Sequence, residues 1–486
     1  MQSTAPIEQA DLVKQNTLSG NDPDNAIKEL ARQLTECKPR RTSFTIPARL
    51  KQFMSFFQEC YEYFEETNKA QVSTSSTSEW LMDNFYVIEQ AVRQVEQDLP
   101  ADYFQRLPKT QDGWTRIYIL ALVNTRREET RLDIEQLKHF FQVFQEITPL
   151  STGELWALPL MLRLAVLESL AEALAAVTKK KWDPLAPPKL GAEVLTSFDL
   201  SDDHDLNVAN SILNLRLLAT QDWKAFFEAA SVLEKILHGD PAGIYSRMDF
   251  DTRNHYRNAI EDLADGSTVD EAGIAAQAIE LAGASTSVRE QHVGYWLIGA
   301  GRETLEAQMK FRPTLFQRLV RAIQKNATVF YLGSIGLLTF ALSLLIILYS
   351  ASVGGTLLHL IAAGVLSLVP VSSVAIDLIN GLVISLIPPR TLPKMNFENS
   401  VPEDCRTIVV IPALLATERD VLFLHSQIER HFIGNSDPNI FFAILTDFAD
   451  APEKEMPNDQ EPIAQTRATI ETLNKKYGNG NYRPFY

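Results

Sequence analysis

Two aspartates near the carboxyl terminus are the residues best placed to do chemistry. Asp447 and Asp450 lie in the segment TDFADA (446–451), directly after the apolar run Ile440–Leu445. If that run is a buried strand, a carboxylate at its end can accept hydrogen bonds from the base or ribose of a nucleotide. The alternative is that either aspartate caps the next turn. On spacing alone the two interpretations are even.

The segments around these aspartates predict the start of an open α/β sheet. Thr407–Pro412 (TIVVIP) is short, apolar and β-branched, which is typical of a buried parallel strand. Thr417–Asp420 then predicts the cap of a helix that reaches about His431. The run that precedes Asp447 is the second expected strand, and a further helix is expected at about Pro462–Tyr477. The order is therefore β-α-β-α.

The carboxyl ends of these two strands define the expected ligand site. In open α/β sheets, ligands bind beyond the carboxyl ends of the strands. Asp447 is expected just after the second strand, and the loop Pro412–Thr417 just beyond the first. Both segments are therefore expected to face one crevice.

The composition and the motifs disfavour several other functions. The chain has 45 Lys and Arg against 61 Asp and Glu, a net charge of −16, which disfavours nucleic acid as a partner. Cys37, Cys60 and Cys405 form no C-x-x-C pattern, so neither a disulfide scaffold nor a thiolate zinc site is expected. The eight histidines show no H-E-x-x-H spacing, and no Walker A or GxSxG pattern occurs. No metal site is supported.

A long uncharged stretch predicts a membrane hairpin. Residues 326–376 contain no Lys, Arg, Asp or Glu. Transmembrane helices are expected at 327–350 and 354–388, the second kinked or split near Pro370. A buried hairpin in a soluble core is the less favoured alternative. Asp377 either marks a polar pathway or, as we favour, lies near the interface or pairs with another helix.

The charges beside the two expected spans predict their orientation. The turn between them has no charge, so the positive-inside rule places both long flanks in the cytoplasm. The amino terminus has no apolar signal-peptide core, so the first ~320 residues are not expected to be exported. The basic flanking residues are Arg312, Arg318, Arg321, Lys325, Arg390 and Lys394.

Residues 1–320 carry most of the negative charge and have helical patterns. A loop is expected at STSSTS (73–78), followed by a helix at Glu79–Asp98. Ser151 and Glu154 form a capping-box pattern before the apolar run Leu155–Val177. Arg163, Glu168 and Glu172 interrupt that run, so a buried bundle helix is favoured over a third span.

Four charged residues in the same region are a weaker candidate site. Arg247, Asp249, Arg253 and Arg257 precede or lie in an expected helix, Thr252–Ala264, with Asp251 or Thr252 as its cap. They could form a binding cluster. A salt-bridged junction between loop and helix is the favoured interpretation.

Several long motifs resemble the cyclic β-1,2-glucan synthases, a family of very large bacterial inner-membrane proteins. Two of them resemble the opening of the glycosyltransferase domain of that family: VPEDCRTIVVIPALLATERDV (401–421) and DPNIFFAILTDFADAPE (437–453). Segments 79–90, 152–165, 240–264 and 292–306 resemble its amino-terminal helical region. The order of helical region, membrane pair and sugar-nucleotide domain also matches.

The resemblance implies a function and assigns residues to it. It implies processive transfer of glucose from UDP-glucose to a growing β-1,2-glucan, by a GT-A-type domain on the cytoplasmic face of the inner membrane. By this resemblance, Asp447 matches the first acidic position of the nucleotide-sugar site, and Asp450 is its neighbour in that site. Pro412, Thr417 and Glu418 match the loop after the first strand.

The sequence departs from the family in what it lacks. A complete enzyme is expected to use Mg²⁺ or Mn²⁺ held by a D-x-D pair, together with a catalytic base. Neither can be identified after Asp450. We therefore expect an amino-terminal part of such an enzyme that is inactive alone. The alternative is a membrane-anchored helical scaffold protein with a vestigial α/β stub.

The expected architecture is thus mainly α, in four parts. A cytoplasmic helical region is expected over 1–320, membrane helices over 327–350 and 354–388, and an incomplete GT-A-like sheet over 401–486.

Overall fold

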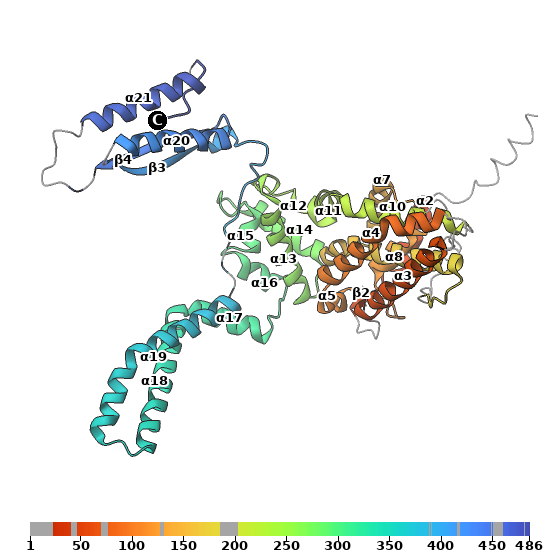
Figure 1. Cartoon of the computed structure of the whole chain (residues 1–486), viewed down its shortest axis with the longest axis horizontal. Coiled ribbons are helices and arrows are strands. Elements are labelled where there is room, and N and C mark those ends of the chain that lie inside the picture. Colours follow the sequence, from red (N-terminus) through yellow and green to blue (C-terminus); the bar gives the residue numbers. More distant parts are fainter. Residues whose placement is uncertain are drawn as a thin grey trace, which may run out of the picture. The chain divides into compact units, whose positions relative to one another are not determined.

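The computed structural model describes most of the chain (Figure 1). The described residues are 23–39, 46–69, 76–126, 131–184, 203–387, 389, 391–415, 418–448, 450, 460–480 and 482–486. They form two compact units: one comprises residues from 1–246 and 253–391, and the other residues from 247–252 and 392–486. The expected fold class is confirmed, since helices dominate and the second unit holds a small parallel sheet. The four-part division remains a prediction.

The helices that precede the parallel sheet form a bundle and then a hairpin. The short strands β1 (Lys38–Pro39) and β2 (Pro108–Lys109) pair antiparallel within the bundle. The bundle and its extension contain α2 (Pro23–Gln33), α3 (Ile46–Lys69), α4 (Ser76–Asp98), α5 (Ala101–Arg106), α6 (Arg116–Thr125), α7 (Ile134–Gln145), α8 (Thr152–Thr178), α10 (His204–Thr220), α11 (Trp223–Ala230), α12 (Val232–Leu237), α13 (Phe250–Asp265), α14 (Glu271–Ala284), α15 (Val293–Leu297), α16 (Arg302–Gln308) and α17 (Leu315–Lys325). The hairpin consists of α18 (Ala327–Ser352) and α19 (Leu357–Leu386).

Helix α8 is the central helix of the bundle. It packs against α3, α4, α6 and α10, and it is buried along most of its length. The capping box is confirmed, because Ser151 Oγ accepts from Glu154 N (3.2 Å) and Glu154 Oε2 accepts from Ser151 N (3.0 Å). The interpretation of a buried bundle helix is also confirmed. Its Glu168 is paired with Arg49, so the charge inside the bundle has a partner.

Two predictions about helix starts were wrong in detail. The expected loop at 73–78 is helical from Ser76, where α4 begins; residues 73–75 lie outside the described part. Thr77 is buried and donates to Asp205, so its hydroxyl is satisfied inside the helix start. Helix α13 begins two residues before the expected Thr252. Its cap is Asp249, whose carboxylate accepts from Thr252 N (2.8 Å).

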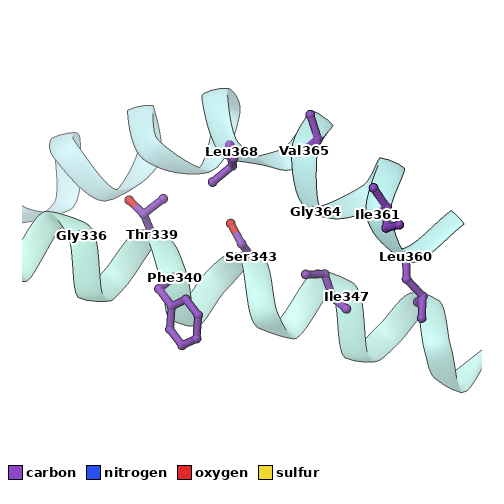
Figure 2. A pocket seen from close by; sticks show the side chains of 10 residues that line it. All are labelled: Gly336, Thr339, Phe340, Ser343, Ile347, Leu360, Ile361, Gly364, Val365 and Leu368. Carbon is purple, nitrogen blue, oxygen red and sulfur yellow. The ribbon is translucent and has the colours of Figure 1, made fainter. Parts of the chain in front are cut away.

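Helices α18 and α19 are long and apolar enough to span a membrane. They pack side by side, and Tyr331 near the start of α18 donates to Asn380 near the end of α19 (2.8 Å). Helix α19 continues through Pro370, so it is not split there. Between the helices lies an apolar groove of about 640 Å³, toward which the Thr339 and Ser343 hydroxyls are directed (Figure 2). Asp377 is exposed on α19, one turn from Asn380.

The second unit is built on a parallel sheet. Strand β3 (Thr407–Leu415) pairs in parallel with β4 (Ile440–Phe448), joined by α20 (Glu418–Gly434), and α21 (Gln460–Tyr477) follows. The last residues add the beginning of a third parallel strand beside β4. Phe442 N donates to Pro484 O (2.8 Å), and Ile444 N donates to Tyr486 O (3.0 Å). This third strand is not among the elements predicted from the sequence.

Candidate functional site

The expected site residues Pro412 and Asp447 lie inside the strands and not in the loops beyond them. Pro412 pairs with Leu445, and Leu414 pairs with Asp447, so each strand is three residues longer than expected. Proline fits here because the backbone N–H groups of successive residues point alternately to the two edges of a strand. Thr407 N donates toward β4, so the nitrogen of Pro412, five residues later, faces the outer edge of β3, where it need not donate.

The two strands present different faces. Residues on alternate positions point to opposite sides of a sheet. Helices α20 and α21 cover one side through Ile428 and Leu473, which pack with Phe442 and its neighbours. Pro412 and Asp447 belong to the opposite side. The apolar residues of that side are well exposed: Ile408, Val410, Leu414 and Leu445.

The strand order explains why both helices lie on one side. Across the sheet, the strands lie in their sequence order: β3, then β4, then the third strand. Connections between parallel strands are right-handed, so two connections that both step the same way across the sheet place their helices on the same face. This is the arrangement of one half of a doubly wound sheet. In such sheets, the ligand crevice lies where the strand order reverses, next to the first strand. Among the described residues no strand lies beyond β3, so the corresponding position would be the outer edge of β3.

The structure describes only some of the residues expected to bind the nucleotide sugar. The Asp447 and Asp450 side chains are exposed. Glu418 is the first residue of α20, which begins three residues after β3 ends. Thr417 lies outside the described residues. An exposed carboxylate at Asp447 can accept hydrogen bonds from hydroxyl or ring N–H groups of a ligand at this edge.

The described residues do not by themselves fit a complete divalent-metal site. In the part of the chain that the structure describes, no three His, Cys, Asp or Glu side chains group closely enough to hold an ion. Asp447 and Asp450 are the two carboxylates that the sequence places at the strand end.

The amino ends of the strands are tied down by polar contacts. Asp437 accepts from Val401 N (2.7 Å) and from Asn439 N (2.8 Å). Arg247 forms an ion pair with Asp404 (3.0 Å), and its hydrogen bond lowers the pKa of that carboxyl. Asn396 N donates to Arg247 O (2.8 Å). These contacts fix the entry to β3 at the end opposite the candidate site.

The four charged residues considered as a binding cluster are held in separate contacts, except that Arg253 and Arg257 both pair with Glu234. Arg247 pairs with Asp404 and Asp249 caps α13, whereas Arg257 binds Glu234. Arg253 forms an ion pair with Glu228 (2.5 Å). The favoured interpretation, a salt-bridged junction, therefore describes them correctly.

The first of the two units, residues from 1–246 and 253–391, is called the helical unit, and the second is called the α/β unit. A buried polar network in the helical unit was not predicted from the sequence. Asp240 accepts from Tyr245 N (3.1 Å), Val293 N (2.8 Å) and His292 Nδ1 (2.9 Å), and His292 Nε2 lies 3.0 Å from Tyr256 Oη. Burial alone would raise the pKa of Asp240, but these hydrogen bonds outweigh it and lower the pKa. The sequence separation of the partners hid this network, although DPAGIY and HVGYW were noted as motifs.

A second buried centre adjoins it. Glu234 accepts from Tyr245 Oη (2.7 Å) and is paired with Arg257, whose side chain is 0% exposed. Burial, followed by the charge of Glu234, raises the pKa of Tyr245. Both centres join segments of the helical unit to one another, so their polar groups serve the fold.

The chain is similar to a curated bacterial protein. No protein-family model matches the chain. The chain is 25% identical, over 99% of its length, to the cyclic beta-(1,2)-glucan synthase NdvB of Rhizobium meliloti (strain 1021). It spans only 19% of the length of that protein. The resemblance to cyclic β-1,2-glucan synthases is thereby confirmed across nearly the whole of this chain.

Proposed function

We propose that this chain is the membrane-anchoring and donor-binding part of a glucosyltransferase that builds β-1,2-glucan from UDP-glucose. The observation that carries the proposal is the match over 99% of the chain to a cyclic beta-(1,2)-glucan synthase. The half-sheet supports it, because Asp447 is exposed at the carboxyl end of the strands, where nucleotides bind in open α/β sheets.

The proposed role of Asp447 is to accept hydrogen bonds from the uridine of the donor. Glu418 and Thr417, just after β3, would line the same crevice. A bound Mg²⁺ or Mn²⁺ would neutralise the diphosphate of the donor in the complete enzyme. Since residues 1–486 show no D-x-D pair after Asp450, we expect no glucose incorporation from this segment alone.

Photoaffinity labelling tests the donor site. Membranes that contain the chain are irradiated with a photoreactive UDP-glucose analogue, with excess UDP as competitor. Asp447→Ala is expected to lower labelling at least tenfold, whereas Glu471→Ala, an exposed change on α21, leaves it unchanged. Equal labelling of both variants would contradict the assigned role. Separately, glucose incorporation from radiolabelled UDP-glucose by these membranes would contradict the expected inactivity.

The proposed location is the bacterial inner membrane, with both long flanks in the cytoplasm. The basic residues beside α18 and α19 and the uncharged turn between them support this orientation. Alkaline phosphatase, which is active only outside the cytoplasm, provides the test. A fusion after Gly355 is expected to be active and one after Lys394 inactive. The reverse pattern would contradict the orientation.

A further inference from the structure

Helix α17 has two sharply different faces. At 100° per residue, Leu315, Leu319 and Ile323 fall on one side of the helix, together with Phe316 and Val320. Every polar residue falls on the other side: Gln317, Arg318, Arg321, Gln324 and Lys325. A helix with this division needs an apolar environment on one side and a polar environment on the other.

Most of the apolar face of α17 is left exposed by the described protein, and only Val320 and Ile323 are partly covered. Leu315 is 83% exposed, Phe316 59% and Leu319 55%, and none of the described residues of the helix is buried. The helix is nevertheless well formed. Thr314 and Gln317 make a capping box, with Gln317 N donating to Thr314 Oγ1 (3.2 Å) and Thr314 N donating to Gln317 Oε1 (2.9 Å).

The polar face of α17 is held by the helical unit. Arg321, at the middle of that face, bonds both carboxylate oxygens of Glu306 on α16 (2.7 Å each). Its guanidinium also lies over the Phe311 ring, 5.7 Å from the ring centre. The hydrogen bond to Glu306 raises the pKa of Arg321. These contacts orient the helix so that its apolar face points away from the unit.

The neighbourhood of α17 indicates what that face meets. Helix α18 begins at Ala327, and only Asn326 separates it from α17, with φ −123° and ψ 41° outside the helical region. A break of one residue lets the chain change direction where it enters the membrane. Arg318 and Lys325, seven residues apart, lie along one border of the polar face, where basic side chains reach lipid phosphates.

We propose that α17 lies in the plane of the cytoplasmic membrane surface, with its apolar face among the upper acyl chains. Arg318 and Lys325 then contact anionic headgroups, and Arg321 fastens the helical unit to the surface. The proposal rests on the proposed membrane hairpin, because α18 must enter the bilayer beside α17.

Quenching by brominated lipid tests the proposal on the full chain. A fluorescent amino acid replaces one residue at a time, and each variant is reconstituted in vesicles with or without bromines near the top of the acyl chains. Positions 316 and 319 sample the apolar face; positions 317 and 324 are matched controls on the opposite face. Position 337, exposed on α18, tests the hairpin itself. Aqueous iodide is the second quencher.

We expect brominated lipid to quench positions 316 and 319 at least threefold more than positions 317 and 324. Strong iodide quenching at 316 and 319 would overturn the proposal, because the face would be in water. Weak quenching by both reagents there would also overturn it, because another protein surface would cover the face. If brominated lipid quenches position 337 in either of these cases, the proposed membrane hairpin remains supported and only the proposal for α17 fails. If it does not quench position 337, both proposals fail.

Discussion

The helical unit and the α/β unit differ in how completely they enclose their own interiors. In the helical unit, α8 is buried along most of its length and several inner charges are paired, as in Arg49–Glu168 and Arg116–Glu154. In the α/β unit, one side of the sheet is covered and the other exposes Leu445, which is 62% accessible. The side left open is the side that carries Asp447.

The difference separates structural chemistry from candidate functional chemistry. A buried ion pair that loses one partner leaves an uncompensated charge, so such groups are fixed by the fold. The carboxylate of Asp447 is exposed at its strand end, where a ligand from solution can reach it. Groups whose pKa is strongly shifted by burial, such as Tyr245, are therefore not where function is expected. The following predictions test this contrast.

The largest effect is expected from removing a buried charge in the helical unit. Glu234→Gln leaves Arg257 without its anionic partner, which should lower the local unfolding free energy by about 3–5 kcal/mol. Hydrogen exchange of α12 and α13 in the detergent-solubilised full chain measures the loss. The matched change in the α/β unit, Glu429→Gln, weakens a partly exposed pair with Lys476 and a hydrogen bond from Tyr477 Oη (2.8 Å), and should lower the protection of α20 by at most about 1 kcal/mol. Equal losses of hydrogen-exchange protection in the two variants would contradict the proposed difference between the units.

A comparable effect is expected from the covered side of the sheet alone. Phe442 is 1% exposed and packs with Phe432 and Phe485, so Phe442→Ala should cost about 3–5 kcal/mol. Leu445→Ala, three residues along on the open side, should change stability by at most about 0.5 kcal/mol. Hydrogen exchange of β4 measures both. A large cost at Leu445 would show that its side of the sheet is covered.

A smaller effect, dependent on pH, is expected at Glu271 in the helical unit. Burial raises the pKa of Glu271 to about 7, although its carboxylate accepts from Thr152 N (2.8 Å). Because the folded-state pKa of Glu271 is raised, protonated Glu271 favours the folded state. Its contribution to the free energy of unfolding is fully present below about pH 4.5 and is lost as the pH rises through about 7. A displacement of this size corresponds to about 3 kcal/mol.

Glu271→Gln should abolish that pH dependence in α14 and stabilise the unit at pH 8. Glu280→Gln, an exposed change on the same helix, should keep it. Hydrogen exchange, corrected for its intrinsic pH dependence, provides the measurement. A pH dependence that survives in Glu271→Gln would assign it to another group.

The smallest effect on the molecule is a difference in cysteine reactivity, with one cysteine taken from each unit. Burial raises the pKa of Cys60 to about 11, which lowers its thiolate fraction about 100-fold at neutral pH. Cys405 is partly exposed. Labelling with a small neutral thiol reagent, followed by mass spectrometry, should therefore modify Cys405 at least 100-fold faster. Similar rates would show that the helical unit opens readily.

Local patterns predicted much of this fold. The capping box at Ser151 and Glu154, the two apolar spans and the β-α-β-α order are each written in short stretches of sequence. The end of β4 was missed because hydrophobicity fades at Thr446 and Asp447 while the ladder with β3 continues, and the end of β3 because Pro412 reads as the start of a loop. The strand at Pro484–Tyr486 was missed because its few residues become a strand only through hydrogen bonds to β4.

The site could be predicted less completely for a related reason. Sequence placed Asp447 at a strand end, but which face it shares with Pro412 depends on register, and one residue of slippage would reverse it. The Asp240–His292 pair joins residues that local patterns cannot connect. Helix α17 could be recognised by its periodicity, but its exposed apolar face is known only from the surroundings that the structure supplies.

Pro412 has a consequence for solubility. The strand TIVVIPALL contains no charge and has an open face, so its outer edge could pair with the same segment of another chain and seed aggregation. Proline removes one amide donor from that edge, near the middle of the strand. The same residue that borders the candidate site is therefore expected to disfavour edge-to-edge pairing of this strand between molecules.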